Sequence, residues 1–304
     1  MALQAFANVE PMRLARSGFS GLAQDPYGPR LNRAMDYIDA HLADELALDV
    51  VARVAAFSDG HFHRLFKMWT RETLSHFIQR RRLEAAALRL RHNRWDSVTQ
   101  IAQGSGFASP ETFARAFRRQ FGMSATDWRK FDWVAEADAR LQDTPRFSDA
   151  QVSVRKCPDQ ELLYWRMHGR YEETATLAWQ RFLAWLPTLN LGELPLIGIG
   201  VDDPSITPDE RCRYDTCAVL PASVDWFSAR ASRKTSPGGW YACMSFRGDR
   251  SQIGAAWHWM KSRWLPGSGF SLGASPFLEC YAAGASPLPE DGLVEAELRM
   301  PVRP

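Results

Sequence analysis

The sequence of 304 residues contains no apolar run that approaches the roughly 20 residues of a membrane-spanning helix. Its N-terminus lacks a basic segment followed by an apolar one, so we expect no secretory signal. The five cysteines are an odd number and include no Cys-x-x-Cys pair, which is typical of reduced thiols rather than of a disulfide framework or a zinc site. These absences predict a cytoplasmic protein without a membrane partner.

Motifs of catalysis and cofactor binding are equally scarce. The sequence has no Ser-His-Asp order, no cluster of metal ligands and no glycine loop that could hold phosphates. The pair Gly238-Gly239 is too short for such a loop and is typical of a hairpin turn. We therefore expect no cofactor and no metal, and the protein is predicted not to be an enzyme.

Charge is distributed unevenly, although the net charge is only +2. Residues 30–130 carry 17 lysines and arginines against 11 aspartates and glutamates, whereas residues 151–304 carry 16 against 17. A basic part joined to a near-neutral part is typical of a polyanion-binding module fused to a second domain. The chain length also favours two domains.

Apolar periodicity and good N-cap residues indicate that the first half is all-α. Helices are predicted at 30–42, 48–55, 60–70, 74–91, 97–103, 110–121 and 124–131. The residues before them have no periodicity and are rich in proline and glycine. The predicted organisation is a flexible leader (1–29), an all-α domain (30–131), an acidic linker (132–150) and a second domain (151–304).

After residue 151 the pattern becomes α+β. Strands are predicted at 152–156, 161–168, 196–201, 214–220, 225–231, 240–246, 277–282 and 293–302, with tryptophan-rich helices at 173–186 and 251–264. The half also repeats with an offset of 79 residues, since His168-Gly169 and Arg247-Gly248 each precede a Trp-Leu-Pro segment by the same interval. This predicts two β-α-β-β repeats whose sheets form one saddle. The match is short, and chance similarity is the alternative.

A short pattern occurs twice in the first half, roughly fifty residues apart. Each copy has a short apolar helix, a tight turn and a second helix with Phe-x-Arg-x-Phe followed by a basic residue, at 62–67 and 113–118. A helix-turn-helix needs such a second helix, apolar on its back and polar on the front that enters the major groove. Arg64 and Arg115 occupy matching positions on the fronts, and arginine pairs bidentately with guanine. The pattern therefore predicts two DNA readers.

The helix predicted at 74–91 connects these readers and would be about 27 Å long. Successive major-groove windows lie about 34 Å apart, so one rigid helix could hold both readers on one face of a duplex. The run Arg80-Arg81-Arg82 on this helix is interpreted as a solvated helix face.

The residues of this half form a motif chain that resembles the AraC/XylS-type double helix-turn-helix over about residues 33–130. The chain consists of Leu65-Phe66-Lys67, Arg82 through Ala86, Ile101-Ala102 with Gly106-Phe107, and Phe113 through Gly122. The resemblance implies a sequence-specific transcription regulator, expected to be an activator, with double-stranded DNA as its partner and RNA polymerase as a candidate partner. This sequence departs from the pattern at Arg71-Glu72, where glycine is usual, and at Ser124-Ala125, where Thr-Pro is usual.

The resemblance also implies which residues contact bases. These are Gly60, His63, Arg64, Pro110, Glu111, Ala114 and Arg115. The glycine, proline and alanine among them offer little readout, so His63, Arg64, Glu111 and Arg115 are expected to carry more of it. Lys67, Arg118 and Arg119 lie further along their helices and suit phosphates.

The second half resembles the GyrI-like effector-binding domain over about residues 152–303. The matching segments are His168-Gly169-x-Tyr171, Gly198 through Asp202-Asp203-Pro204, Arg213-Tyr214-Asp215, Pro237 through Ala242, Trp264-Leu265-Pro266 and Glu279-Cys280-Tyr281. The resemblance implies a duplicated fold with an aromatic pocket and an acidic residue near the last segment. It implies a regulator that senses small molecules, as in multidrug sensing.

The chemistry of this half suits an aromatic and cationic effector. Eight of the twelve tryptophans follow residue 150, and aromatic faces attract flat apolar groups and cations. Glu279 lies in an apolar segment, where an unpaired charge is costly, and shares a strand face with Tyr281. A cationic ligand would pair with it, although a nearby arginine or a rim position is the alternative. Trp165, Tyr171 and Trp240 are further candidate ligand contacts, whereas Trp185 and Trp264 suit core packing.

Two other functions stay open. Some GyrI-like domains resemble hydrolases of electrophilic natural products, and Glu279 would then be a general base. The second half could instead recruit a protein partner to DNA.

Overall fold

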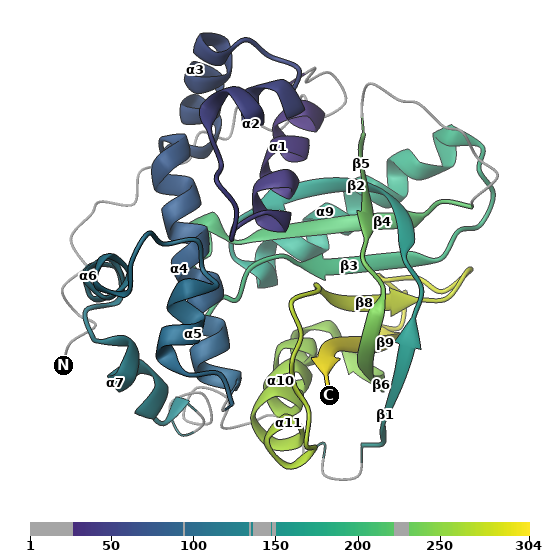
Figure 1. Cartoon of the computed structure of the whole chain (residues 1–304). Helices are drawn as coiled ribbons and strands as arrows, with labels where there is room; N and C mark the ends of the chain where they lie inside the picture. Colours follow the sequence, from purple (N-terminus) through teal and green to yellow (C-terminus); the bar gives the residue numbers. More distant parts are fainter. Residues whose placement is uncertain (1–26, 94, 134, 136–146, 148–149, 222–230) are drawn as a thin grey trace.

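The computed structural model describes residues 27–304, except 94, 134, 136–146, 148–149 and 222–230 (Figure 1). Most of the predicted leader (1–29) and of the predicted linker (132–150) therefore lies outside the described residues. So does most of the strand predicted at 225–231, and the described strand nearest to it begins at Ser232.

The first half is helical, as predicted, and each predicted helix is found within two residues at either end. The helices are α1 (Gly28–Ala40), α2 (Leu48–Val54), α3 (Asp59–Thr70), α4 (Leu74–His92), α5 (Val98–Gln103), α6 (Pro110–Phe121) and α7 (Ala125–Lys130). Local capping explains their ends. Ser97 forms a capping box with Gln100, Ser109 caps α6 ahead of Pro110, and Gly122 ends α6 in the left-handed conformation at φ 73°.

Helix α4 belongs to two small cores and connects them. Its first half packs with α1, α2 and α3, where Phe62, Phe66 and Phe77 are buried. Its second half packs with α5, α6 and α7 around Phe113 and Phe117. Two helix-turn-helix units therefore pack against the two halves of one helix. In Figure 1, α3 lies above α4 and α6 lies to its left.

The second half contains one antiparallel sheet. Its strands are β1 (Val152–Cys157), β2 (Gln160–His168), β3 (Leu196–Gly200), β4 (Arg213–Val219), β5 (Ser232–Ser236), β6 (Gly239–Asp249), β8 (Phe277–Tyr281) and β9 (Leu293–Arg303). Their order is β1-β6-β9-β8-β3-β4-β2-β5, and β7 (Ser271–Leu272), which the sequence pattern did not predict, pairs with β9.

Two repeats of β-α-β-β make up most of this sheet, with β1 and β5 added at its edges, which confirms the predicted fold class. The first is β2, α9 (Tyr171–Trp185), β3 and β4, and the second is β6, a helical segment from Arg250 to Gly267, β8 and β9. Within that segment, helix α10 spans Ile253–Trp259. The repeats meet where β3 pairs with β8, and this register puts Gly198 opposite Glu279.

The two faces of the sheet have different neighbours. Helices α9 and α10 cover one face, and the main core lies there. At the β2–β4 end, the other face lies against α1 of the first half, since Tyr164 donates a hydrogen bond to Asp36 and Arg166 pairs with the same carboxylate at 2.7 Å. Alternate residues of β4 therefore face the main core and the helical half in turn.

Candidate DNA interface and ligand site

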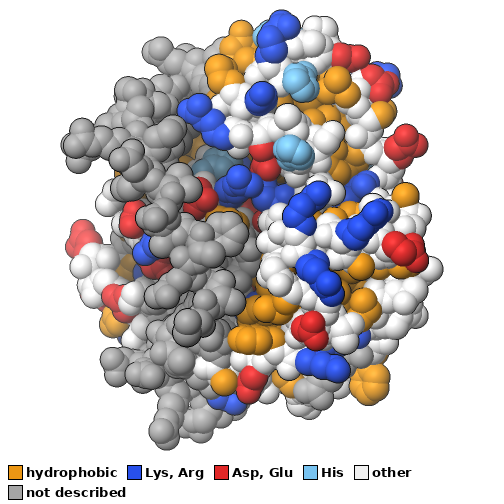
Figure 2. All heavy atoms as spheres, turned by 90° about the vertical axis from the view of Figure 1, so that its left-hand side faces the viewer, with side chains coloured by type: hydrophobic (Ala, Val, Ile, Leu, Met, Phe, Trp, Pro, Cys, Tyr) orange, Lys and Arg blue, Asp and Glu red, His pale blue; other side chains and the backbone are white. Residues whose placement is uncertain are grey.

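The front of both reading helices is exposed, and the back is buried. On α3 and α6 the phenylalanines of the repeated motif are at most 1% exposed and pack in their cores. All ten predicted DNA contacts are exposed, namely Gly60, His63, Arg64, Lys67, Pro110, Glu111, Ala114, Arg115, Arg118 and Arg119. The side of the molecule that carries α3 and α6 has many lysine and arginine side chains spread along it (Figure 2).

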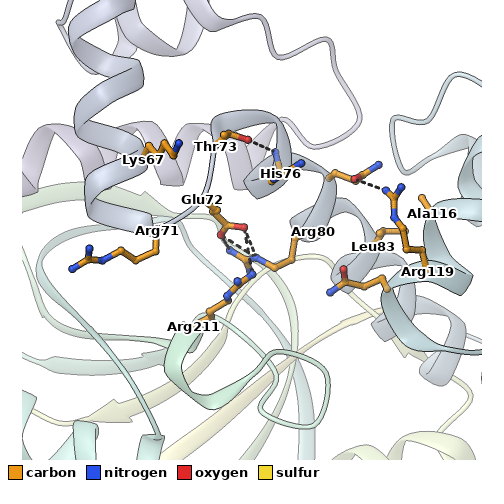
Figure 3. A pocket seen from close by; sticks show the side chains of 12 residues that line it. Lys67, Arg71, Glu72, Thr73, His76, Arg80, Leu83, Ala116, Arg119 and Arg211 are labelled. Atoms are coloured by element: carbon orange, nitrogen blue, oxygen red, sulfur yellow. Dashed lines mark hydrogen bonds and ion pairs between the residues drawn. The ribbon is translucent and has the colours of Figure 1, made fainter. Parts of the chain in front are cut away.

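A cavity of about 570 Å³ lies between the two reading helices. Lys67 of α3 and Arg119 of α6 line it from opposite ends, with His76 of α4 between them (Figure 3). Gln79 of α4 also lines it. Arg119 donates a hydrogen bond of 3.1 Å to Gln79. The second half of the chain also lines this cavity, through Arg211 of the short helix η3 (Asp209–Arg211).

The interpretation of Arg80-Arg81-Arg82 as a solvated helix face is wrong. Arg80 is 6% and Arg81 is 9% exposed. Arg80 pairs with Glu72 at 2.5 Å and with Glu84 at 3.1 Å, and Arg82 donates to the main-chain oxygens of Leu42 and Asp44. The charged residues look solvated in sequence because, apart from Glu84, their partners come from other segments of the chain.

Arg81 extends this network into the second half of the chain. Its guanidinium contacts Asp39 at 2.8 Å and Asp202 at 2.5 Å, and Asp202 also holds Arg213 at 2.7 Å. Burial alone would raise the pKa of Asp202, but Arg213 and Arg81 lower it below the usual range. A continuous set of buried ion pairs therefore connects α1, α4 and the start of β4.

A second buried ion-pair set lies beside the first. Arg166 of β2 pairs with Asp215 of β4 at 2.7 Å and with Asp36 of α1 at 2.7 Å. Lys234 of β5 also contacts Asp215, at 2.5 Å. Both charged residues of the motif Arg213-Tyr214-Asp215 therefore face the helical half, while the tyrosine between them faces the main core.

That tyrosine is part of a polar cluster around Glu279 on the helix-covered face. Glu279 is 7% exposed and accepts hydrogen bonds from Tyr214 Oη at 2.7 Å and from Tyr281 Oη at 3.0 Å. Trp179 Nε1 of α9 donates to Tyr214 Oη at 3.1 Å. Burial and the carboxylate of Glu279 raise the pKa of Tyr214 well above the usual range, so the hydroxyl stays a donor.

Arg250 is the cation nearest to this carboxylate among the described residues. Its Nη1 lies 3.6 Å from Glu279 Oε2, and its Nη2 donates to Tyr281 Oη at 3.0 Å and to the main-chain oxygen of Pro287 at 2.7 Å. The expectation that Glu279 needs a partner is met by the chain itself. Gly198 provides the space, because a Cβ there would lie 2.8 Å from Glu279 Oε2.

The other predicted ligand contacts are not all brought to this cluster. Tyr171 stacks edge-on against Tyr214 at 5.7 Å, but its hydroxyl is held by the main chain of Asp202 and Arg213. Trp165 stacks on Trp185 at 4.7 Å, further along α9. Trp240 is 45% exposed at the start of β6, opposite Lys156 of β1.

No site role was predicted from the sequence for four residues of the cluster, Trp179, Gly198, Tyr214 and Arg250, although Gly198 and Tyr214 lie in segments that carried the GyrI-like resemblance. Strand alternation carried a signal for Tyr214, since it lies between two charged residues that share the opposite face. Nothing in the sequence signals Arg250, because the turn after β6 brings it to the site.

Within the described residues, no helix is long and apolar enough to cross a membrane.

Two family models together cover most of the chain. A helix-turn-helix domain model matches residues 51–130, and a GyrI-like small molecule binding domain model matches residues 150–303. The regulatory protein SoxS of Salmonella typhimurium (strain LT2) is 37% identical over 95 residues, which are 31% of this chain and 88% of SoxS. The Right origin-binding protein of Escherichia coli (strain K12) is 26% identical over 230 residues, which are 70% of this chain and 76% of that protein.

Among solved structures, a transcriptional regulator from Chromobacterium violaceum with an AraC-type DNA-binding domain is 26% identical, with a TM-score of 0.32 over 34% of this chain and 90% of that one. The GyrI-like model spans half of the chain, and SoxS is matched over most of its length. The chain therefore belongs to the AraC-type transcription regulators, and a GyrI-like small molecule binding domain follows its double helix-turn-helix.

Proposed function

We propose that this regulator inserts α3 and α6 into two successive major-groove windows of its operator. The observation that carries the proposal is the exposure of every predicted contact, while the phenylalanines behind them are buried. Arg64 and Arg115 are the residues most suited to read guanine, and His63 and Glu111 add readout beside them. Lys67, Arg118 and Arg119 would hold the phosphates that set the position of each helix.

The ligand that the second half senses would be flat, aromatic and cationic. The cluster around Glu279 combines a carboxylate with the rings of Trp179, Tyr214 and Tyr281, which suits such a cation. Since Arg250 already neutralises Glu279, a cationic ligand would bind by taking over the contacts of that guanidinium. Of the other candidates, Tyr171 borders the cluster, and Trp165 and Trp240 are the more distant ones.

Strand β4 is the element that would couple the ligand to DNA. Tyr214 reaches the Glu279 cluster, whereas Arg213 on its other face pairs with Asp39 of α1 at 2.8 Å. A ligand that moved Tyr214 would therefore act on the buried pairs that hold α1 and α4. A ligand that binds the Glu279 cluster but leaves operator affinity unchanged would contradict this route.

We further propose binding rather than catalysis at Glu279. Its Oε2 atom is engaged by two tyrosine hydroxyls with an arginine close by, an arrangement that holds a carboxylate rather than freeing a base. A purified protein that hydrolyses a reactive electrophile, and loses this activity in Glu279→Gln, would refute the proposal.

We also expect the protein to be cytoplasmic, to associate with the nucleoid and to activate transcription through RNA polymerase. In vitro transcription with purified polymerase tests the activation.

The main experiment compares Arg64→Ala and Arg115→Ala on a selected operator and on unrelated DNA. Each variant should lose roughly 1–3 kcal/mol of specific binding and relax base preference in one window only. Arg247→Ala is the matched control, because Arg247 is an exposed, ion-paired arginine on β6. Unchanged operator affinity in both reader variants would refute the DNA-reading assignment.

A further inference from the structure

We propose that the ligand-sensing half makes a DNA contact of its own, in which Arg211 binds a backbone phosphate in the cavity between the two reading helices. The inference rests on the proposed docking of α3 and α6. It goes beyond that docking because the sensing half would then form part of the DNA-binding surface.

The cavity has the charge of a phosphate site. Lysine, arginine and histidine side chains from α3, α4, α6 and the segment between α3 and α4 line it, and they face one acidic residue, Glu72 (Figure 3). Lys67, Arg71 and Arg119 are exposed and bring positive charge to its rim. With a volume of about 570 Å³, the cavity can accommodate a phosphodiester. Its position between the two readers puts it opposite the backbone that connects their groove windows.

Arg211 is presented to this cavity by a fixed piece of backbone. The short helix η3 is closed by hydrogen bonds from Arg211 N to Pro208 O at 2.8 Å and from Cys212 N to Asp209 O at 3.1 Å. Two residues further on, Arg213 is buried and pairs with Asp39 and Asp202. The buried network that joins the two halves of the chain therefore also positions Arg211 beside the readers.

Glu72 pairs unequally with the two arginines that it contacts. Its distance to Arg80 is 2.5 Å, and both of these side chains are at most 9% exposed. Its distance to Arg211 is 3.4 Å, and the side chain of Arg211 is 42% exposed. A long, half-exposed ion pair contributes little to stability, whereas an arginine–phosphate contact is charge-assisted and can be bidentate. Arg211 can therefore exchange Glu72 for a phosphate while Arg80 keeps Glu72 neutralised.

The test measures operator binding of the full-length protein as a function of salt concentration. Arg211→Ala should bind operator and unrelated DNA about three- to ten-fold more weakly at about 0.1 M salt, because one phosphate contact is lost. The slope of log affinity against log salt should fall by about 0.9, and the specificity ratio should stay unchanged. Arg211→Lys should retain most of the slope, and Arg247→Ala should match the wild type.

A neutral methylphosphonate linkage between the two groove windows sharpens this test. It should weaken binding by the wild type and leave Arg211→Ala unaffected, since the contact is already absent there. If Arg211→Ala kept the wild-type affinity and salt slope while Arg64→Ala was impaired, the Arg211 proposal would be overturned and the proposed docking of α3 and α6 would stand. If Arg64→Ala and Arg115→Ala were also unimpaired, the proposed docking itself would fail. Loss of inorganic phosphate binding in Arg211→Ala without any effect on DNA would assign the cavity to a free anion and overturn the proposal.

Discussion

Individual residues have the clearest consequences at the Glu279 cluster. Glu279 and Tyr281 share a strand face, and their side chains are hydrogen-bonded at 3.0 Å. Arg250 faces both of them across the cluster. Arg250 thus pairs with the carboxylate in the absence of a ligand, so a cation that bound here would compete with a group of the protein itself. Removing Arg250 should therefore raise the affinity for cations, whereas removing Glu279 should lower it.

Substitutions of these two residues should shift ligand affinity in opposite directions. Arg250→Gln should bind a flat cationic dye about ten-fold more tightly, because the competing cation is removed, whereas Glu279→Gln should abolish binding. Quenching of tryptophan fluorescence by the dye measures both, since Trp179 lies at the cluster. Operator affinity without dye serves as the control for folding and should stay near wild type. Weaker dye binding in Arg250→Gln would mean that this arginine recognises the ligand rather than competes with it.

Helix α4 does more than hold the two readers apart, which is the role that its length suggested. It connects the two readers, as its periodicity predicted, and its Arg81 side chain is also buried against acids from α1 and from the loop after β3. Buried ion pairs do not have to stabilise a fold, but removing one partner leaves the other charge unpaired. Arg81 is therefore the side chain of α4 that pairs with acids from both halves of the chain.

Arg81→Met should therefore destabilise the whole molecule by about 3–5 kcal/mol, because Asp39 and Asp202 would then share Arg213, which leaves one buried negative charge uncompensated. Urea unfolding measures the loss. Arg53→Met is the matched control, since Arg53 forms an exposed pair with Asp49 on α2 and should cost less than about 0.5 kcal/mol. Equal effects of the two substitutions would show that the buried network contributes no more than a surface pair.

At the scale of the whole molecule, the two halves share a buried polar interface rather than a hinge of loose contacts. Asn93, the residue that follows α4, accepts a hydrogen bond from the main-chain N–H of Leu272 at 2.9 Å and donates one to its main-chain oxygen at 3.3 Å. Asn32 of α1 donates a hydrogen bond to Ser232 at 3.0 Å. Two histidines lie among the charged groups of this interface. Burial, followed by Arg166 and Arg213, lowers the pKa of His168 to about 4. Burial, followed by Lys261 and Arg91, lowers the pKa of His92 to about 3.

The stability of the molecule should therefore fall as the pH drops from about 6.5 towards 4. In this window the unfolded chain takes up protons on both histidines while the folded chain does not, so protonation favours unfolding. Each histidine contributes a slope of at most about 1.4 kcal/mol per pH unit. Urea unfolding between pH 7 and 4.5 measures how the free energy of unfolding changes with pH. His168→Gln should reduce this slope by the contribution of one histidine. Stability that is constant over this range would contradict the assignment.

Local patterns in the sequence were enough for the helices, the strand faces and the two readers. Helix ends follow from caps such as Ser97 and Gly122, and the phenylalanine spacing on α3 and α6 already separates a buried back from an exposed front. The duplication of the sheet domain was readable for the same reason, because each repeat keeps its own turn and tryptophan helix. These are short-range properties, in which each residue acts mainly on its neighbours along the chain.

Only the tertiary structure decided how the charged and polar groups are paired. Arg81 meets Asp202, which is 121 positions away, and Glu279 meets Tyr214, which is 65 positions away. The run Arg80-Arg81-Arg82 looked solvated because a charged side chain has the same sequence pattern whether it faces water or a distant counter-ion. The sequence by itself therefore determined the DNA readers and the two-part design. The pairing of Glu279 with Arg250, the buried connection between the halves and the position of Arg211 beside the readers depend on long-range contacts, which no local pattern encodes.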